Sequence, residues 1–396
     1  MKIPQIFLKP GKEQSLKRFH PWIFSGAIKY LPDNIKEGDL VEVVDSQGNF
    51  LALGHYQIGS ITVRIITFEK EIIDDNFWEK RISKAYQLRK DIGVAENPET
   101  NVYRLIYGEG DEIPGLVADV YNDTIVIQAH TVAIYRLKHV FCNAFKNILS
   151  DKLTAVFDKS ETTLPFKAGL NPENGFIYGK SNSSIVLENG LKFKADWEKG
   201  QKTGFFIDQR ENRVLLEKYS SGRNVLNLFS YTGSFSVYAM RGNAKSVHSV
   251  DSSERAIELA NENVTLNFPD DERHKAFSAD AFKFMEQAEN KYDLIILDPP
   301  AFAKHLNVVQ NALKGYRRLN AKAFEIIKPG GLLFTFSCSQ VVSPELFRTT
   351  VFSAAAQSGR KVKILHQLVQ PADHPINIYH PEGEYLKGLV VRVESL

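Results

Sequence analysis

The sequence predicts an α/β protein whose C-terminal half forms an open, doubly wound parallel sheet. After a hairpin-like stretch that ends near residue 219, apolar strand-like runs alternate with helical patterns, which is typical of consecutive βαβ units. Residues 1–75 instead contain short alternating strands with glycine turns, and residues 76–190 mix both kinds of pattern. A chain of 396 residues exceeds one ordinary core. We therefore expect three domains: a small β-barrel (1–75), a central α+β domain (76–190) and the doubly wound domain (191–396).

Charge and cysteine content exclude several classes of protein. The formal net charge is only +2, so any contact with nucleic acid must come from local basic patches. The two cysteines, Cys142 and Cys338, form neither a disulfide pattern nor a metal-ligand pattern, and we expect no metal. No window resembles a membrane span, and the opening residues lack a secretory signal. We therefore expect a cytoplasmic protein.

The first two predicted domains supply strands, a long helix and aromatic residues. In residues 1–75, basic side chains are mixed with Phe19, Trp22 and Phe24, a combination that can hold an RNA backbone and stack on bases. Alternatively, Trp22, Ile23 and Phe24 are barrel core and the lysines lie on the solvated surface. Helical spacing predicts one helix over 76–93 and another over 131–149. Cys142 lies on the second helix, where a free cysteine is usually an inert small hydrophobe.

Four successive strand ends of the third domain carry polar side chains. The first strand, in the stretch RNVLNLFSYTG, runs into a turn, and the next three strands end at or near an aspartate. Parallel strands of a doubly wound sheet place their carboxyl ends at one edge, where ligands bind. The predicted ligand-binding residues are Asn227, Phe229, Ser230, Thr232, Gly233, Asp251, Asp280 and Asp298.

The chemistry of this edge predicts S-adenosylmethionine (SAM) as the cofactor. A dinucleotide site uses G-x-G-x-x-G to approach a pyrophosphate, whereas NLFSYTGS keeps one glycine and adds hydroxyls. A ligand with ribose and adenine but no phosphate fits better. We expect its amino-acid end at 227–233, its ribose on Asp251 and its adenine near Asp280. Asp251 could instead simply cap the following helix.

The stretch YDLIILDPPAFAK (292–304) and the later Cys338 predict a site for a planar base. Asp298 follows a buried strand, and the stiff Pro299-Pro300 pair and Phe302 come next, so an acid lies beside a flat ring. Cys338 follows a strand that we expect after a turn at residues 329–331. A thiolate there can add to C6 of cytosine and make C5 nucleophilic, while Asp298 bonds to the base. Taken alone, Cys338 would more often be a buried structural thiol.

Several motifs, in this order and spacing, resemble one known family. They are HPWIFSGAI (20–28), KTGFFIDQR (202–210), NLFSYTGSFS (227–236), LDPPAFAK (297–304), FSCS (336–339) and PEGEYLKG (381–388). The whole chain resembles the bacterial large-subunit (23S) ribosomal RNA cytosine-C5 methyltransferase I family. The resemblance implies an N-terminal PUA domain, a central α+β domain and a Rossmann-like class I SAM-dependent methyltransferase domain.

The resemblance also implies roles for individual residues. The family's catalytic cysteine corresponds to Cys338 and its motif-IV acid to Asp298, while 227–233 forms the cofactor loop. The residues implied to line the substrate side of the cleft are Lys202, Gln209, Arg210, Pro299, Pro300 and Phe302. Broader RNA 5-methylcytosine enzymes carry a second cysteine where this chain has Ala301, so product release has no assigned residue.

Two other functions stay open, as does the oligomeric state. D-P-P-[FY] also resembles enzymes that methylate nitrogens of guanine or adenine, for which no thiol is needed. A non-catalytic RNA-binding or ribosome-assembly factor with a decayed methyltransferase fold is the second alternative, against which the intact Asp251, Asp280, Asp298 and Cys338 argue. The sequence fits a monomer or a homodimer equally well.

Overall fold

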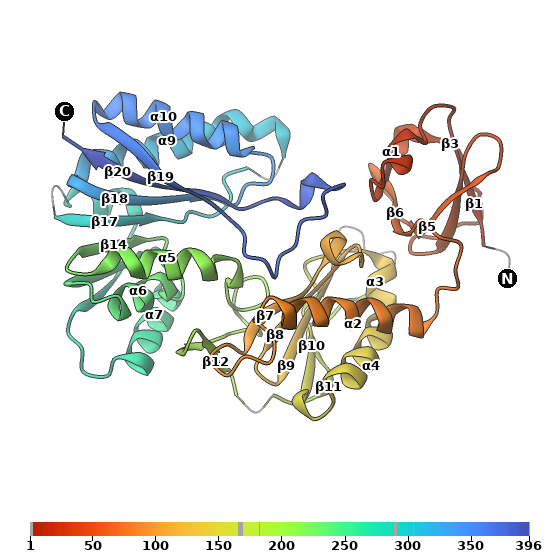
Figure 1. The fold of residues 1–396 in the computed structure, drawn as a ribbon, viewed down its shortest axis with the longest axis horizontal. Coiled ribbons are helices and arrows are strands. Elements are labelled where there is room, and N and C mark those ends of the chain that lie inside the picture. The colour runs from red at the N-terminus through yellow and green to blue at the C-terminus, as the bar shows by residue number, and fades with distance from the viewer. Residues whose placement is uncertain (1–2, 165–168, 182, 289–290, 304, 396) are drawn as a thin grey trace. The chain divides into compact units, whose positions relative to one another are not determined.

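The computed structural model describes residues 3–164, 169–181, 183–288, 291–303 and 305–395, which form two compact units (Figure 1). Unit 1 comprises Met1–Gly190, Ala195–Ile207 and Ala372–Gly383. Unit 2 comprises Leu191–Lys194, Asp208–Pro371 and Glu384–Leu396. The chain therefore returns to unit 1 twice, at Ala195 and, late in its sequence, at Ala372. The finer division of the chain at residues 75 and 190 stays a prediction.

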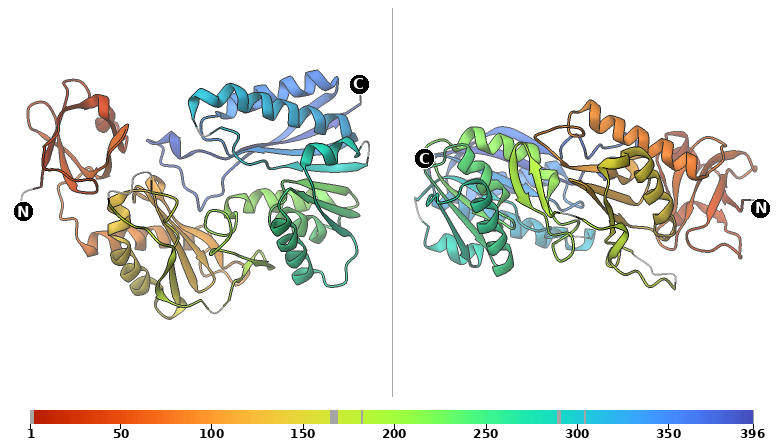
Figure 2. Two further views of the ribbon diagram at one scale, coloured as in Figure 1. Left: turned by 180° about the vertical axis from the view of Figure 1, so that it is seen from behind. Right: turned by 90° about the horizontal axis from the view of Figure 1, so that it is seen from below.

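The first sheet of unit 1 has six strands in the order β2-β6-β5-β4-β1-β3 and is strongly curved (Figure 2). Its strands are β1 (Gln5–Leu8), β2 (Trp22–Phe24), β3 (Ile28–Tyr30), β4 (Leu40–Val44), β5 (Phe50–Tyr56) and β6 (Ile61–Thr67), with the short helix α1 (Gln14–Lys17) after β1. Alternate apolar residues such as Ile6, Val41 and Val63 fill its core. Phe19 and Phe24 are 48% and 47% exposed, so these two aromatics are not core residues.

The second sheet of unit 1 has the order β11-β10-β9-β8-β7. Its strands are β7 (Val102–Tyr107), β8 (Leu116–Tyr121), β9 (Thr124–Ala129), β10 (Ala155–Asp158) and β11 (Gly175–Gly179). The helix predicted over 76–93 is confirmed as α2 (Asp75–Asp91), with Asp74 as its N-cap. The helix predicted over 131–149 is interrupted at Leu137, which separates α3 (Val132–Arg136) from α4 (Lys138–Leu149). Cys142 is buried on α4 in the apolar core.

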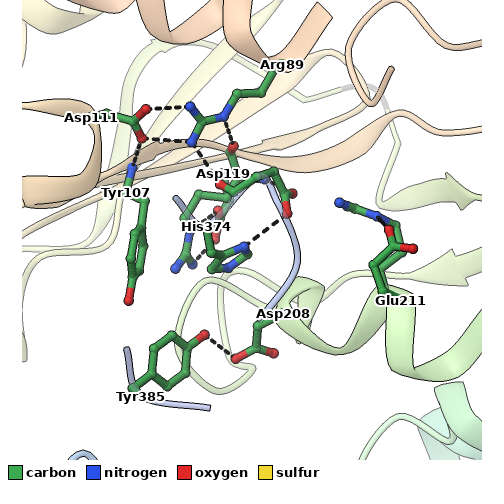
Figure 3. A network of polar contacts seen from close by, with 11 residues as sticks. Arg89, Tyr107, Asp111, Asp119, Asp208, Glu211, His374 and Tyr385 are labelled. Carbon is green, nitrogen blue, oxygen red and sulfur yellow. Dashed lines mark hydrogen bonds and ion pairs between the residues drawn. The ribbon is translucent and has the colours of Figure 1, made fainter. Parts of the chain in front are cut away.

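A buried polar network ties the late segment Ala372–Gly383 into unit 1. Arg89 on α2 is fully buried and pairs with Asp111 (Figure 3). The Arg89 Nη2 also donates to the backbone oxygen of Asp373 at 2.8 Å, and the Asp373 carboxylate accepts from the backbone N–H of Arg104 at 3.0 Å. At the end of the segment, the Tyr107 hydroxyl donates to the Gly383 carbonyl at 2.7 Å. A buried arginine needs such partners, because an unpaired charge in the interior is costly.

Unit 2 contains a seven-stranded sheet in the order β16-β15-β14-β17-β18-β20-β19. Its strands are β14 (Asn224–Leu228), β15 (Ser246–Asp251), β16 (His274–Ser278), β17 (Tyr292–Leu297), β18 (Ile327–Ser337), β19 (Lys361–Val369) and β20 (Lys387–Glu394). The strands β14 to β18 run parallel, whereas β20 is antiparallel to both of its neighbours. The strand order reverses direction between β14 and β17, so the predicted doubly wound sheet is confirmed.

Helices cover both faces of this sheet (Figure 1). They are α5 (Arg210–Ser220), α6 (Ser234–Arg241), α7 (Glu254–Asn267), α8 (Ala281–Glu286), α9 (Val309–Ile326) and α10 (Pro344–Ser358). Figure 1 shows α9 and α10 on one face and α6 and α7 on the other. The turn predicted at residues 329–331 is wrong: these residues lie within β18, as an irregularity in its pairing with β17. Gly330 has φ +80°, so the backbone bends there without ending the strand.

The remaining elements are short. They are β12 (Ile185–Glu188) in unit 1, β13 (Leu191–Lys194) in unit 2, and the 3₁₀ turns Ser25–Ala27, Gly108–Asp111, Ser150–Lys152, Ile207–Gln209, Leu306–Val308 and Pro381–Gly383. Among the residues that the structure describes, no helix combines the length and the apolar character needed to cross a membrane.

Candidate active site

The loop after β14 has an unusual backbone that turns it back toward the sheet. Phe229, Tyr231 and Gly233 have φ angles of 59°, 44° and 72°, in the left-handed region that only glycine enters readily. A side chain on Gly233 would place its Cβ 2.8 Å from the Cβ of Ala260 on α7. The Thr232 carbonyl accepts from Asn263 of α7 at 2.8 Å. Two non-glycine residues in this conformation are typical of a loop shaped for a ligand.

Two buried polar atoms of this loop region lack a hydrogen-bond partner among the described residues. They are the Oδ1 of Asn227 and the Oγ of Ser230. The Nδ2 of Asn227 donates to Ser236 Oγ at 3.0 Å, and Ser236 Oγ lies 2.7 Å from Ser249 Oγ. Ser249 Oγ in turn lies 2.8 Å from the Nε2 of His274. Since buried polar groups are rarely unpaired, the two oxygens fit a ligand that carries donors, as the ammonium end of SAM does.

Asp251 ends β15 and does not cap α7. Its Oδ2 accepts from the backbone N–H of Tyr231 at 3.0 Å, and its Oδ1 accepts from that of Ser253 at 3.0 Å. The N-cap of α7 is Ser253, whose Oγ accepts from Ala256 N at 3.3 Å. Each carboxylate oxygen accepts more than one hydrogen bond, so Asp251 keeps acceptor capacity for two hydroxyls of a ribose.

Asp280 is exposed and caps α8. Its Oδ1 accepts from the backbone N–H of Lys283 at 3.0 Å. This aspartate therefore has a complete local structural role. It lies two residues beyond β16, whose neighbour β15 ends in Asp251, so both acids are at the same edge of the sheet.

Asp298 follows β17 directly and is partly buried. Its Oδ2 accepts from Gln209 Nε2 at 3.1 Å. The Oε1 of Gln209 accepts from Asn212 Nδ2 of α5 at 2.6 Å, so the amide of Gln209 has a fixed orientation. Asp298 and Gln209, which belong to two separate motifs of the sequence, are therefore in direct contact.

Cys338 follows β18 and contacts the loop that follows β17. The thiol Sγ lies 3.9 Å from the Pro299 carbonyl oxygen, within the range of an S–H···O contact. Next to it, Ser339 Oγ accepts from Ala303 N at 3.2 Å and lies 2.9 Å from the Tyr316 hydroxyl. These contacts fix the cysteine turn against the loop that carries Asp298.

Aromatic packing completes this wall of the site. Phe302 packs on Tyr316 of α9 with ring centroids 4.6 Å apart. Pro299 is buried and Pro300 is exposed, while Cys338 is partly exposed. The arrangement places a partly exposed cysteine against the loop that carries Asp298 and Phe302, at the ends of adjacent strands.

Comparisons with known proteins identify the family. Residues 176–389 match the S-adenosylmethionine-dependent methyltransferases, and residues 6–68 match the PUA-like domains. Ribosomal RNA large subunit methyltransferase I of Alteromonas mediterranea is 39% identical over 395 residues, which cover 98% of each chain. The chain belongs to this methyltransferase family. The predicted SAM dependence and the N-terminal PUA-like domain are thereby confirmed.

Two solved structures have the same fold over nearly the full length of this chain. A protein of Streptococcus mutans assigned as a SAM-dependent methyltransferase has 24% sequence identity and a TM-score of 0.85. The match covers 99% of this chain and 100% of that one. A second structure, SMU.776 complexed with SAH, matches with 24% identity and a TM-score of 0.86 over 99% of this chain and 100% of its own.

Three of the predicted site residues of this methyltransferase lie in a single sequence motif but not in one unit. Lys202 belongs to unit 1, has φ +48° and lies over the Phe206 ring at 5.5 Å. Gln209 and Arg210 belong to unit 2, and the buried Arg210 donates from Nε to Glu211 at 3.3 Å. Asp208 of the same motif accepts from the Tyr385 hydroxyl (Figure 3).

The sequence reasoning assigned no role to Lys387 or Tyr316, which both adjoin the cysteine turn. Tyr316 contacts Ser339 and Phe302, as described above. Lys387 begins β20 opposite Ser337 and donates to two backbone carbonyls of the turn. The one signal for Lys387 was its place in the motif PEGEYLKG, which gives no indication of its burial.

Proposed function

We propose that this methyltransferase methylates C5 of a cytosine in large-subunit (23S) ribosomal RNA, with Cys338 as the nucleophile. The name of its 39% identical relatives supports ribosomal RNA as the substrate. The observation that favours the cytosine-C5 reaction is the contact of Cys338 with Pro299, the residue after Asp298. Nitrogen methylation needs no thiol nucleophile, whereas methylation of cytosine C5 through a covalent adduct does.

The cofactor side is proposed to consist of Asn227, Phe229, Ser230, Thr232, Gly233, Asp251 and Asp280, with Asp298 at its border with the base. Asn227 Oδ1 and Ser230 Oγ would accept from the amino-acid end, and Asp251 from the ribose hydroxyls. Asp280, exposed at the same edge, would meet the adenine. When bound, SAM supplies a methyl group on a sulfonium that a carbon nucleophile can accept.

On the base side, Cys338 adds to C6 and forms a sulfur–carbon bond. The electron pair of the C5–C6 double bond then makes C5 nucleophilic, and negative charge spreads over the ring toward N3. Asp298 binds the ring: as a carboxylic acid it would donate its proton in a hydrogen bond to N3 and so stabilise that charge, and as a carboxylate it would accept from the exocyclic amine. After methylation, a base removes the C5 proton, the double bond reforms and Cys338 leaves as a thiolate.

The remaining predicted residues are proposed to hold the RNA. Pro299, Pro300 and Phe302 would border the base, and Gln209 would keep Asp298 oriented through its hydrogen bond. Lys202 would face the substrate backbone, whereas Arg210, whose side chain is only 2% exposed, would help to form the cleft from below its surface. A cytosine inside a helix must be flipped out or presented unpaired to reach such a site. The exposed Phe19 and Phe24 of the PUA-like domain offer stacking surfaces for unpaired RNA.

The decisive experiment measures methyl transfer from labelled SAM to protein-free large-subunit ribosomal RNA, followed by nucleoside analysis. Wild type is expected to produce labelled 5-methylcytosine, and Cys338→Ala none. Cys142→Ala is the matched control, because Cys142 is the chain's other cysteine and is buried in unit 1. If wild type and Cys338→Ala instead produce equal amounts of labelled guanosine or adenosine, the reaction takes place at a ring or exocyclic nitrogen.

A second experiment tests the covalent step itself. RNA with 5-fluorocytosine at the target has no C5 proton to remove, so the Cys338 adduct should persist after methyl transfer. Denaturing electrophoresis is expected to show a protein–RNA band with wild type and with Cys142→Ala, but not with Cys338→Ala. Absence of the band with an enzyme that is active on ordinary RNA would refute a covalent mechanism. Failure of the full-length protein to bind SAM or SAH would favour a non-catalytic assembly factor.

A further inference from the structure

Lys387 is a buried lysine whose ammonium group lies against the turn that carries Cys338. It is the first residue of β20, it pairs with Ser337 of β18, and the residue is 5% exposed. The Nζ donates to the carbonyl oxygens of Ser339 and Val342, both at 2.7 Å. These two carbonyls belong to the turn between β18 and α10, so Lys387 holds the residues that directly follow Cys338.

Burying the Lys387 ammonium group costs free energy, which a nearby negative charge would offset. A buried ammonium loses its hydration, and two neutral carbonyls compensate for that loss only in part. Burial lowers the pKa of Lys387 to about 8, whereas Cys338 and Glu384 raise it. Lys387 therefore still carries its charge on most molecules at neutral pH. Electrostatic interaction is reciprocal, so a cation that a Cys338 thiolate stabilises also stabilises that thiolate.

Other titratable groups near the turn do not replace this cation. Tyr316 of α9 is a neutral phenol at neutral pH, and burial raises its pKa further. Asp298 at the end of β17 and Glu384 just before β20 are acids, which disfavour a thiolate when ionised. Among these neighbours, Lys387 is the group whose charge favours the reactive form of Cys338.

We propose that Lys387 is a positioning residue that orients the Cys338 turn and, through its charge, stabilises the Cys338 thiolate. The proposal rests on the proposed nucleophilic role of Cys338 and deepens it. A thiol reacts as its thiolate, so a cation beside it increases the reactive fraction at neutral pH. A purely structural lysine would cap the two carbonyls without affecting the ionisation of the thiol, and the two roles are therefore separable by experiment.

The test measures the pH dependence of Cys338 alkylation by iodoacetamide in the full-length protein, without RNA. In this reaction the thiolate displaces iodide and forms a sulfur–carbon bond, so the rate follows the thiolate fraction. Peptide mass spectrometry separates Cys338 from Cys142. Four variants are compared with wild type: Lys387→Gln, Lys387→Met, Lys387→Arg and Lys363→Met. Lys363 is the matched control, because it lies on the neighbouring strand β19 with its side chain 68% exposed.

Lys387→Gln and Lys387→Met are expected to raise the alkylation midpoint by about one pH unit, which slows alkylation about tenfold at pH 7. Gln keeps a donor for the carbonyls and so separates lost charge from lost hydrogen bonding. Lys387→Arg keeps the charge and should stay near the wild-type midpoint, as should Lys363→Met. A wild-type midpoint in Lys387→Gln would overturn the proposal. So would faster alkylation of Lys387→Met at every pH with an unchanged midpoint, because it would mean that Lys387 only closes the turn.

Wild type provides a measurement that does not depend on how the variants fold. Its Cys338 midpoint is expected below the value of about 8.5 of a free thiol, and a midpoint at or above that value would refute the electrostatic role. A different result would show that the proposed function itself is wrong. Methyl transfer that survives Cys338→Ala would remove the nucleophile from the reaction, whereas the alkylation profile would still report whether Lys387 acts on the thiol.

Discussion

Replacement of Asp251 by alanine tests the cofactor site most directly. If Asp251 accepts two ribose hydroxyls, Asp251→Ala removes two hydrogen bonds of about 0.5–1.5 kcal/mol each. The affinity for SAH should then fall by about 1–3 kcal/mol, which corresponds to a dissociation constant about 5- to 150-fold higher. The same change also removes the acceptor for Tyr231 N and Ser253 N, both at 3.0 Å. We expect this loss to lower the free energy of unfolding by roughly 1–2 kcal/mol.

The assay is isothermal titration of SAH into the folded protein, paired with thermal denaturation of the free protein. Ser253→Ala is the matched control. It removes the N-cap of α7, two residues away, and should lower stability by about 1 kcal/mol without a change in SAH affinity. The comparison therefore separates damage to the loop from loss of a ligand contact.

Two results would refute the reasoning about Asp251. Unchanged SAH affinity in Asp251→Ala would mean that the carboxylate serves only the backbone of Tyr231 and Ser253. An equal loss of affinity in Ser253→Ala would mean that the loss results from general disturbance of the start of α7. Only a loss confined to Asp251→Ala supports the ribose contact.

Three further predictions address the base side, the cofactor loop and pH. Asp298→Asn should slow methyl transfer at least about tenfold in single-turnover assays with little change in SAH affinity, and a loss confined to binding would count against its place at the base. Gly233→Ala should lower the thermal midpoint more than Gly222→Ala does, because both have φ near +70° but only the first would contact Ala260; equal effects in the two variants would contradict this. Burial lowers the pKa of His274 to about 4, so protons bind the unfolded state preferentially below about pH 6.5. Stability should therefore fall as pH drops from 6.5 toward 4, and a His274→Gln variant should show a smaller fall in thermal midpoint over that range; an identical pH dependence would show that His274 makes no contribution.

The sequence predicted the sheet of unit 2 well because each strand is a buried apolar run that ends in polar residues. The ends of β14, β15 and β17 at Leu228, Asp251 and Leu297 follow directly from that pattern. Where several neighbouring residues could each cap a helix, the sequence does not show which of them is the cap. Asp251, Ser252 and Ser253 are all possible N-caps of α7, and the backbone geometry selects Ser253.

Structural features that depend on contacts between residues far apart in the chain have no recognisable pattern in the local sequence. The interruption at Leu137 between α3 and α4 has no glycine or proline to mark it. Residues 329–331 have the composition of a turn, yet pairing with neighbouring strands keeps them in β18. The burial of Lys387 follows from the packing of β20 beside β18, and no property of the residues around it in the sequence predicts it.

The return of Ala372–Gly383 to unit 1 has a consequence for the order in which the protein matures on the ribosome. Synthesis runs from the N-terminus, so Arg89 and Tyr107 leave the exit tunnel long before Asp373 and Gly383 exist. Until then, Arg89 lacks the Asp373 carbonyl and has its pairing with Asp111 and its hydrogen bond to the Arg104 carbonyl, and the nascent unit 1 lacks one of its segments. Its completion therefore waits for almost the entire chain, so that the N-terminal unit and the catalytic unit reach their final form at nearly the same moment.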